Sequence, residues 1–254
     1  MPSCIRVLQL PSNVTMSTLR THEVWFYLSP SQAAHLRKLV RDYKPKMGRS
    51  WKLRTDDQLW LRVLSQVVVA GNAAPGYTLQ ESTAVREKLG FSRLKKLTPR
   101  RRRKVIHSVL QAIGTRYVGK SAKNRKVDAA RHNFNTLADA GSPKRFFKNV
   151  AQEKSKEERI ALLSRTLSYY KKKGCRDILI ELCLATDCMA LDQRIRRILE
   201  SVGAKVPKSI DGHFEEIENA LIQRVAEPSG LSGGELDRIL FQNYGDIMVR
   251  LLCP

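Results

Sequence analysis

One carboxylate in a basic segment is the residue of this sequence best placed to do chemistry. Asp192 opens the segment MALDQRIRRILESVG, in which apolar residues recur at helical spacing, so we expect an amphipathic helix that begins beside Asp192. The opposite face of that helix carries Arg194, Arg196 and Arg197. A carboxylate at a helix start among arginines is suited to meet a positive centre that develops beside a phosphate backbone. The alternative is that Asp192 only stabilises the helix through its macrodipole.

Helical patterns cover nearly the whole chain, so we predict an all-α fold. Thr55 and Gln58 form a capping-box pattern at the start of one helix. Pro99 suits a first helical turn, and Gly203 and Gly230 suit helix ends. The expected helices begin near residue 30 and then span 55–71, 79–89, 99–117, 122–138, 156–170, 175–185, 192–202, 212–226 and 234–252.

The charge of the chain points to a polyanionic partner. Its 254 residues include 46 Lys and Arg against 24 Asp and Glu, a formal net charge of +22, and the pI is about 10.2. Nucleic acid is the most frequent partner of such proteins. Apolar residues make up 42% of the chain, which is enough for a folded core and excludes a disordered basic tail.

This charge is unevenly distributed. Residues 88–127 contain 14 Lys or Arg and no acid, whereas residues 209–254 contain eight acids against three bases. Unbroken charge of one sign repels itself unless a polyanion relieves it, so we predict that the densest basic run binds phosphate. That run comprises Arg100, Arg101, Arg102, Arg103 and Lys104. The alternative is a solvated helix face.

We expect no metal ion, no cofactor and no membrane span. Cys175, Cys183 and Cys188 cluster, but their spacing matches no common zinc pattern, and packing on a helix explains them better. The five cysteines show no regular pairing, which favours reduced thiols in a reducing compartment. No apolar run approaches the roughly 18 residues needed to cross a bilayer, and the N-terminus lacks a signal-peptide pattern. We expect a cytoplasmic, nucleoid-associated protein.

Two segments together resemble a known enzyme family. Residues 156–202 combine a helix (KEERIALLSRTLSYY), the basic turn KKKG, a second helix (CRDILIELCLA), a short loop and the helix that begins at Asp192. Residues 57–66, DQLWLRVLSQ, match a helix of the same family. The chain thereby resembles the helix-hairpin-helix (HhH-GPD) DNA glycosylase superfamily, which includes the endonuclease III, alkyladenine and 8-oxoguanine enzymes. The archaeal 8-oxoguanine branch looks most similar.

The resemblance covers about residues 55–205 and departs from the family pattern in two ways. The usual hairpin Leu-Pro-Gly-Val-Gly is absent, and Gly174 alone is retained. Bifunctional members place a nucleophilic lysine at a set distance before the aspartate. In this chain that position is Gly174, and Lys173 lies one residue further back.

The resemblance implies a single all-α domain of two lobes with a cleft between them. One lobe would comprise about residues 56–188, including the hairpin at 156–186, and the other residues 1–55 and 189–254. Asp192 would stabilise the cationic sugar that forms when an N-glycosidic bond breaks, or activate the attacking water. Lys173 would attack the sugar and form a Schiff base, or contact a phosphate instead. We expect hydrolytic removal of a base from DNA.

DNA contacts and a base pocket follow from the same resemblance. Gln66 would fill the gap left by an extruded base, and a buried capping role is the alternative. Backbone N–H groups around Lys172 and Gly174 would hold a phosphate at a helix start, with Lys171 and Arg194 nearby. The candidate pocket residues are Trp25, Phe26, Trp51, Asn72 and Tyr77. Aromatic residues at helix edges more often pack in a core.

We expect the partner to be double-stranded DNA with a flipped nucleotide, bound by a monomer. Two other functions fit the same observations: a non-catalytic DNA-binding module on this scaffold, and a basic RNA-binding or ribosome-associated protein. The sequence leaves the target base open. Oxidised guanine follows from the most similar branch, whereas alkylated bases and bulky modified bases, including those of phage DNA, are alternatives.

Overall fold

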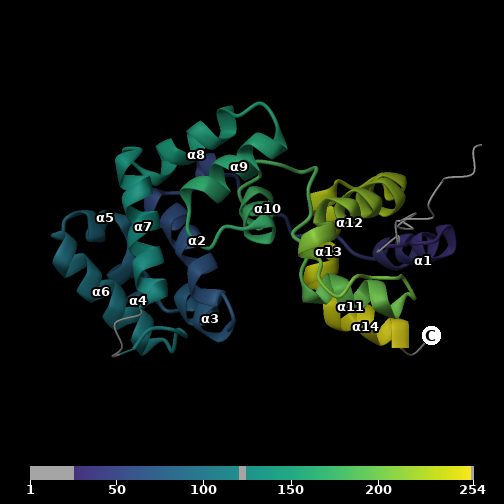
Figure 1. Ribbon diagram of the computed structural model, residues 1–254, viewed down its shortest axis with the longest axis horizontal. Coiled ribbons are helices and arrows are strands. Elements are labelled where there is room, and N and C mark those ends of the chain that lie inside the picture. The colour runs from purple at the N-terminus through teal and green to yellow at the C-terminus, as the bar shows by residue number, and fades with distance from the viewer. Residues whose placement is uncertain (1–25, 120–123, 253–254) are drawn as a thin grey trace, which may run out of the picture.

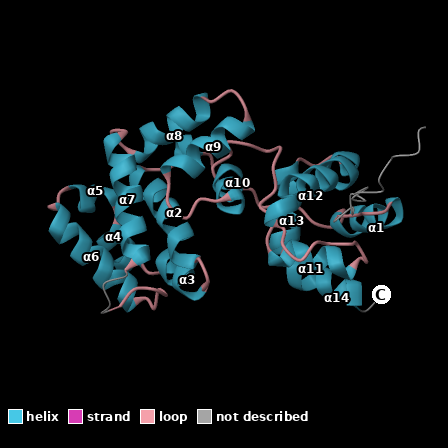
Figure 2. Cartoon of the chain, viewed as in Figure 1, coloured by secondary structure: helices cyan, strands magenta, loops and turns pink. Residues whose placement is uncertain are grey.

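The computed structural model describes residues 26–119 and 124–252 as a helical molecule. Figure 2 shows helices joined by loops, and within these residues the β geometry is confined to one isolated antiparallel bridge between Tyr27 and Lys205. The predicted all-α class is confirmed. Figure 1 shows two lobes side by side along the long axis. In the described part of the chain, no helix is both long and apolar enough to cross a bilayer.

The large lobe surrounds one hydrophobic core. Its elements are η1 (Trp51–Leu53), α2 (Asp56–Val69), α3 (Ala74–Glu81), α4 (Thr83–Leu89), α5 (Phe91–Lys95), α6 (Pro99–Ala112), α7 (Arg125–Asp139), α8 (Pro143–Gln152), α9 (Lys156–Thr166) and α10 (Lys172–Glu181). Helix α2 begins with the predicted capping box between Thr55 and Gln58. Its Trp60 is fully buried, donates from Nε1 to the Leu89 carbonyl and meets Phe134 edge to face. These contacts hold α2, and with it the side chains on its exposed face, in place.

The small lobe combines the two ends of the described chain around a second core. Its elements are α1 (Pro30–Val40), α11 (Gln193–Ser201), η2 (Asp211–His213), α12 (Phe214–Leu221), the π-helix η3 (Ile222–Ala226), η4 (Glu227–Ser229), α13 (Gly233–Gln242) and α14 (Tyr244–Leu252). The two cores meet at the linker, where Ala190 packs in the large lobe and Met189 and Leu191 pack in the small one. The predicted lobe boundaries near residues 55 and 188 stay a prediction.

Several predicted helices differ in extent from the observed ones; the segment 234–252, for example, is divided between α13 and α14. The segment 79–89 belongs to two helices, because Ser82 ends α3 and caps α4 by accepting the Val85 N–H. The helix predicted over 99–117 ends at Ala112, shortly before Gly114 adopts a left-handed φ of +73°.

The hairpin is also built differently from the prediction. Lys171 is the N-cap of α10, and residues 172–174 form its first turn instead of a turn between helices. The chain reverses earlier, where Tyr169 adopts a left-handed φ of +69°. Gly174 packs closely against Gln66: a Cβ atom at residue 174 would lie 2.8 Å from Gln66 Nε2, so the end of that side chain would have to move.

A buried ion pair joins the two lobes. Arg176 of α10 donates to both carboxylate oxygens of Glu218 of α12 at 2.8 Å, and these side chains are 4% and 1% exposed. Glu218 also accepts the Met189 N–H at 2.8 Å. The N–H group of the next residue, Ala190, donates a hydrogen bond to the buried Asp237 of α13 at 2.7 Å. Two buried carboxylates of the small lobe therefore fix the linker that leads into α11.

Loss of one partner of this ion pair should destabilise the protein strongly, because it leaves a buried charge uncompensated. We expect Glu218→Ala to lower the free energy of unfolding by about 3–5 kcal/mol, measured by urea denaturation. Glu216→Ala is the control, since its exposed side chain faces His213 and should change stability by less than about 1 kcal/mol. Equal losses in the two variants would contradict the role assigned to Glu218.

Asp237 should make stability depend on pH. Burial raises the pKa of Asp237 from 3.8 to about 7, and the nearby charge of Asp177 acts in the same direction. A carboxyl whose pKa is higher in the folded than in the unfolded protein binds more protons when folded, so its stabilising effect is lost as pH rises through that interval. We expect the wild-type urea midpoint to fall across this range relative to Asp237→Asn, which keeps an oxygen acceptor for Ala190. Parallel pH profiles of the two proteins would show that Asp237 is ionised throughout.

Candidate active site

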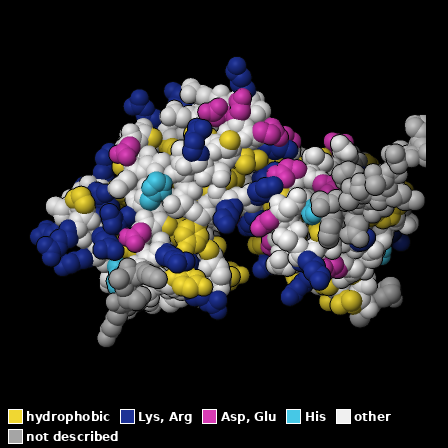
Figure 3. All heavy atoms as spheres, in the orientation of Figure 1, with side chains coloured by type: hydrophobic (Ala, Val, Ile, Leu, Met, Phe, Trp, Pro, Cys, Tyr) yellow, Lys and Arg dark blue, Asp and Glu magenta, His cyan; other side chains and the backbone are white. Residues whose placement is uncertain are grey.

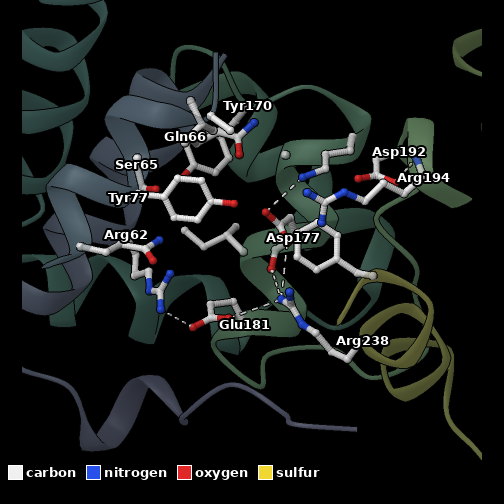
Figure 4. A pocket seen from close by; sticks show the side chains of 18 residues that line it. Arg62, Ser65, Gln66, Tyr77, Tyr170, Asp177, Glu181, Asp192, Arg194 and Arg238 are labelled. Atoms are coloured by element: carbon white, nitrogen blue, oxygen red, sulfur yellow. Dashed lines mark hydrogen bonds and ion pairs between the residues drawn. The ribbon is translucent and has the colours of Figure 1, made fainter. Parts of the chain in front are cut away.

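A cavity of about 420 Å³ lies between the two lobes. The large lobe lines it with α2, α3 and α10, and the small lobe with α11 and α13 (Figure 4). Figure 3 shows the hollow between the lobes, with basic side chains on its borders. The sequence-predicted site residues that line this one cavity are Gln66, Tyr77, Lys173, Gly174, Asp192 and Arg194.

Asp192 is positioned by the start of α11. It is the N-cap residue, and its Oδ1 accepts the N–H groups of Arg194 at 2.9 Å and of Ile195 at 3.1 Å. Both bonds go to one oxygen, and the half-buried side chain forms part of the cavity wall. The helix-stabilising role considered from the sequence is therefore present, and Asp192 contributes a carboxylate to the cavity in addition.

Lys173 reaches the cavity from the first turn of α10. Its Nζ lies 3.2 Å from Oδ2 of Asp177, one helical turn further on. The two preceding lysines do not line the cavity: Lys172 Nζ is 2.8 Å from Glu215 Oε2 of the small lobe, and Lys171 is exposed at the N-cap. Of this basic run, Lys173 alone shares the cavity with the Asp192 side chain.

Side chains of alternating charge form ion pairs that connect the walls of the cavity. Asp177 and Glu181 of α10 both lie 3.4 Å from Arg238 Nη2 of α13. Glu181 also pairs with Arg62 of α2 at 2.9 Å (Figure 4). Sequence reasoning missed all four residues. The available signal was the i, i+4 spacing of Lys173, Asp177 and Glu181, which places them on one helix face.

Gln66 and Tyr170 lie close together at one end of the cavity (Figure 4). Gln66 packs against the backbone at Gly174, which leaves its amide beside the N-terminal turn of α10. The Tyr170 hydroxyl donates to the Val63 carbonyl at 3.4 Å. Burial raises the pKa of Tyr170 well above its usual value, so this hydroxyl stays protonated and is unsuited to act as a base.

Of the five residues predicted for a base pocket, the structure places Tyr77 at the cavity. Phe26 is 4% exposed in the small-lobe core, and Trp51 is 9% exposed in the large-lobe core. Asn72 lies just before α3, where its side-chain oxygen accepts the Ala74 N–H at 3.2 Å. Trp25 lies outside the described residues. Core packing, the alternative considered from the sequence, therefore applies to Phe26 and Trp51, because burying a whole ring stabilises more than leaving it at a cavity edge.

Phe241 of α13 is an aromatic residue of the cavity that the sequence pattern did not single out. It is 37% exposed, and the Arg194 guanidinium lies 4.3 Å from its ring centroid. Tyr77, which is 58% exposed, comes from the opposite lobe. Two accessible rings from different lobes thus border one cavity, an arrangement able to hold a flat group.

The basic run of residues 100–104 lies away from the cavity. In Figure 1, α6 is at the outer end of the large lobe, whereas α10 and α11 border the gap between the lobes. Arg102 points inward and donates to the carbonyls of Leu94 at 3.1 Å and Leu97 at 3.2 Å. Arg103 forms an ion pair with an aspartate of α7 at 3.3 Å. Binding of DNA by this run, predicted from the sequence, would therefore take place outside the cavity.

The clustered cysteines pack within the fold. Cys175 and Cys188 are fully buried in the large-lobe core, and burial raises the pKa of the Cys175 thiol to about 12. Cys183 is exposed. Over residues 26–119 and 124–252, no group of three or more His, Cys, Asp or Glu is arranged to hold a metal ion.

The chain is similar to known proteins in its three-dimensional structure. No family model and no curated protein matches the sequence. The 8-oxoguanine DNA glycosylase of Methanocaldococcus jannaschii matches over 85% of this chain and 94% of its own, with a TM-score of 0.61 and 16% identity. The 8-oxoguanine DNA glycosylase of Thermotoga maritima matches over 83% and 86%, with a TM-score of 0.54 and 17% identity. A complex of the Methanocaldococcus jannaschii 8-oxoguanine glycosylase/lyase with a 15mer DNA containing 8-oxoguanine matches over 86% and 98%, with a TM-score of 0.60 and 16% identity.

At this identity the likeness concerns the fold. The resemblance is confirmed at the level of fold: the chain shares its helical fold with 8-oxoguanine DNA glycosylases.

Proposed function

We propose that this chain is a DNA glycosylase, which receives a nucleotide flipped out of duplex DNA in the cavity and breaks its N-glycosidic bond. The observation that carries the proposal is that Asp192 and Lys173, on two helices of different lobes, line the same cavity. A carboxylate and an amine at one site are the groups that this chemistry uses. The shared fold with known glycosylases supports the same function.

The cavity suits a single flipped nucleotide. Its volume of about 420 Å³ falls within the range of about 300–1,000 Å³ that is common for small-ligand sites. Tyr77 and Phe241 offer ring faces for stacking from the two sides. We assign Gln66 to the space that the flipped nucleotide leaves in the duplex. Such contacts offset the few kcal/mol that unstacking costs.

Asp192 would act on the sugar. When the bond between C1′ and the base nitrogen breaks, its electron pair leaves with the base, which takes up a proton, and C1′ becomes cationic. Both backbone N–H groups donate to Oδ1 of Asp192, so we assign Oδ2 to face the cationic C1′. A water molecule then adds to C1′ and passes a proton to the carboxylate or to solvent, which completes hydrolysis.

Replacing Asp192 by Asn should abolish base release while preserving DNA binding, because Asn retains a capping oxygen but carries no charge. We expect the single-turnover rate to fall by at least about 10²-fold. The measurement is mass spectrometry of bases freed from a panel of modified duplexes, which starts with 8-oxoguanine because the structural neighbours act on it. Duplex affinity, measured by fluorescence anisotropy, should stay within about threefold, since Asp192 is not a phosphate contact.

Asp187→Asn provides the matched control, because it removes an exposed carboxylate from the same linker. Base release should be unchanged in this variant. Equal activity of Asp192→Asn and wild type would remove Asp192 from the mechanism. A wild-type protein that binds duplex DNA and releases no base would be the non-catalytic module, and preference for A-form or single-stranded RNA would support the RNA-binding alternative.

The position of Lys173 favours a second activity, cleavage of the DNA strand. Its amine would attack C1′ as the base leaves with the bonding electrons, and Nζ would give up a proton, for which Asp177 Oδ2 at 3.2 Å is a suitable acceptor. Opening of the sugar ring then yields a Schiff base, and elimination of the 3′ phosphate cuts the strand. The ion pair between Lys173 and Asp177 has to open before this attack.

Borohydride trapping tests the covalent step. We expect a covalent protein–DNA adduct with the wild type and none with Lys173→Gln. Lys172→Gln is the control and should retain the adduct, because Lys172 pairs with Glu215 outside the cavity. Base release without any adduct in the wild type would leave hydrolysis as the sole reaction, and an adduct that persists in Lys173→Gln would assign the nucleophile to another amine.

A further inference from the structure

A second cationic surface lies on the outside of the large lobe, which we name the outer basic strip. It consists of the exposed side chains of Arg100, Arg101 and Lys104 on α6 and of Lys144, Arg145 and Lys148 on α8. In the described structure, none of the six takes part in an ion pair of 4 Å or less, and none lines the cavity. Figure 3 shows dark-blue side chains gathered over the end of the lobe where Figure 1 places α6.

The part of the strip on α6 is held rigidly. Ile106, Val109 and Leu110 bury the inner face of this helix in the lobe core. Arg102 fastens the same helix to the end of α5 and lies 4.1 Å from the ring centroid of Phe134. The outward residues of the first turn and a half are therefore presented at fixed spacing, with no acid in that turn. The helix backbone is already ordered, so phosphate binding restricts only the long cationic side chains. The entropic cost of binding is therefore small.

The two halves of the strip are joined. Lys95, at the end of α5, donates to the Gly141 carbonyl at 3.4 Å, just before α8 begins. Arg145 Cδ lies 3.3 Å from the position that a Cβ on Gly141 would occupy. The starts of α6 and α8 therefore face the same region, and both helix N-termini carry the positive end of the macrodipole.

Within the described residues, nearby acids form no ion pair with the strip, and two of their carboxylates accept backbone N–H groups instead. Asp56 accepts the Lys144 N–H at 2.7 Å, and Asp57 accepts the Ser92 N–H at 2.7 Å. Beyond Lys144, α8 and η1 enclose a surface groove of about 790 Å³, whose charged lining residues are Lys52, Lys144, Arg145 and Lys148. The groove extends the cationic surface without adding an acid.

The composition of the strip favours duplex DNA over a single strand. Single-stranded nucleic acids bind to aromatic side chains on which the bases stack. The exposed aromatic side chains of the described chain are Tyr27, Tyr77, Tyr117 and Phe241, none of them in the strip, and Trp51 in the groove is 9% exposed. Cations and helix N-termini without stacking groups contact phosphates and do not read bases.

We propose that the outer basic strip binds a second segment of duplex DNA at the same time as the cavity side of the protein binds the first. The two surfaces lie on different parts of the molecule, since α6 is at the outer end of the large lobe and the cavity is between the lobes. One protein molecule then bridges two duplexes. A bridging protein passes directly from one DNA segment to another, which widens its search beyond sliding along one duplex. This property does not depend on base excision.

A capture experiment tests the proposal. The protein is bound to an immobilised 20-base-pair duplex, excess protein is washed away, and a second, fluorescent duplex is added. We expect the wild type to retain the second duplex. The triple variant Arg100→Glu, Arg101→Glu, Lys104→Glu should retain it at least about tenfold less, because about three phosphate contacts are lost. In a plot of the logarithm of the capture constant against the logarithm of salt concentration, the slope of this variant should be less steep than that of the wild type by roughly three.

Two further variants make the result specific. Lys38→Glu, Arg41→Glu, Lys44→Glu carries the same change in net charge at exposed positions of the small-lobe end and should capture the second duplex within about twofold of wild type. Lys144→Glu, Lys148→Glu on α8 should show the same loss as the α6 variant, which guards against a local folding defect in α6. Capture by the α6 variant equal to that by the small-lobe variant would overturn the proposal.

Three other outcomes would also overturn it: no capture by the wild type, preferential capture of single strands or of duplex RNA, and sedimentation showing that two protein molecules join the two duplexes. Asp192→Asn should capture the second duplex as wild type does. The α6 variant should release base from a single lesion-containing duplex at low salt within about threefold of the wild-type rate, since none of its changes touches the cavity. Failure of excision and failure of bridging are therefore separate results.

Discussion

The fold and the site both depend on the buried ion pair between Arg176 and Glu218. Removing two charges from water is costly, and the cost is offset here by two 2.8 Å hydrogen bonds, the Met189 N–H and the ring of Phe214, 4.5 Å from the guanidinium carbon. The pair connects α10 to α12 and, through Met189, to the linker. Because α10 carries Lys173 and the linker ends at Asp192, this interaction helps to set the relative positions of the two groups to which we assign the chemistry, together with the bond from Ala190 to Asp237.

The cavity wall extends this coupling between the lobes. Arg238 of the small lobe lies between Asp177 and Glu181 of the large lobe, and Glu181 also holds Arg62. Each carboxylate therefore has a cation on either side, which keeps the partly buried charges of the wall compensated. A rotation of one lobe against the other would separate these pairs. The geometry of Lys173 and Asp192 is thus protected by the same contacts that shape the cavity, so the site is preorganised before any DNA arrives.

The sequence was sufficient for features that depend on local pattern. The helical period predicted that Asp192 stands at the start of α11, and the motif resemblance predicted that Gln66 and Lys173 belong to one site. Features that depend on contacts distant in sequence were beyond it. Glu218 lies in an acidic segment that reads as solvated surface, and its partner is 42 residues away. Phe26, which packs in a core, and Phe241, which lines the cavity, have the same local pattern, because periodicity reports which face is buried and not what covers it.

The net charge of +22 has a different physical role on each side of the molecule. At the cavity, the cations are held by the acids of α10, so they contribute geometry and little free field. In the outer basic strip on α6 and α8 the cations form no ion pair within the described residues, although Arg103 of α6 pairs with Asp128. Long-range attraction of a polyanion is therefore expected mainly from the outer surface, while the proposed selection of a nucleotide would depend on the compensated interior. Under the proposed function, affinity for DNA and chemistry on DNA would be separable in this fold: a change in surface charge would alter the first without moving any atom that the second requires.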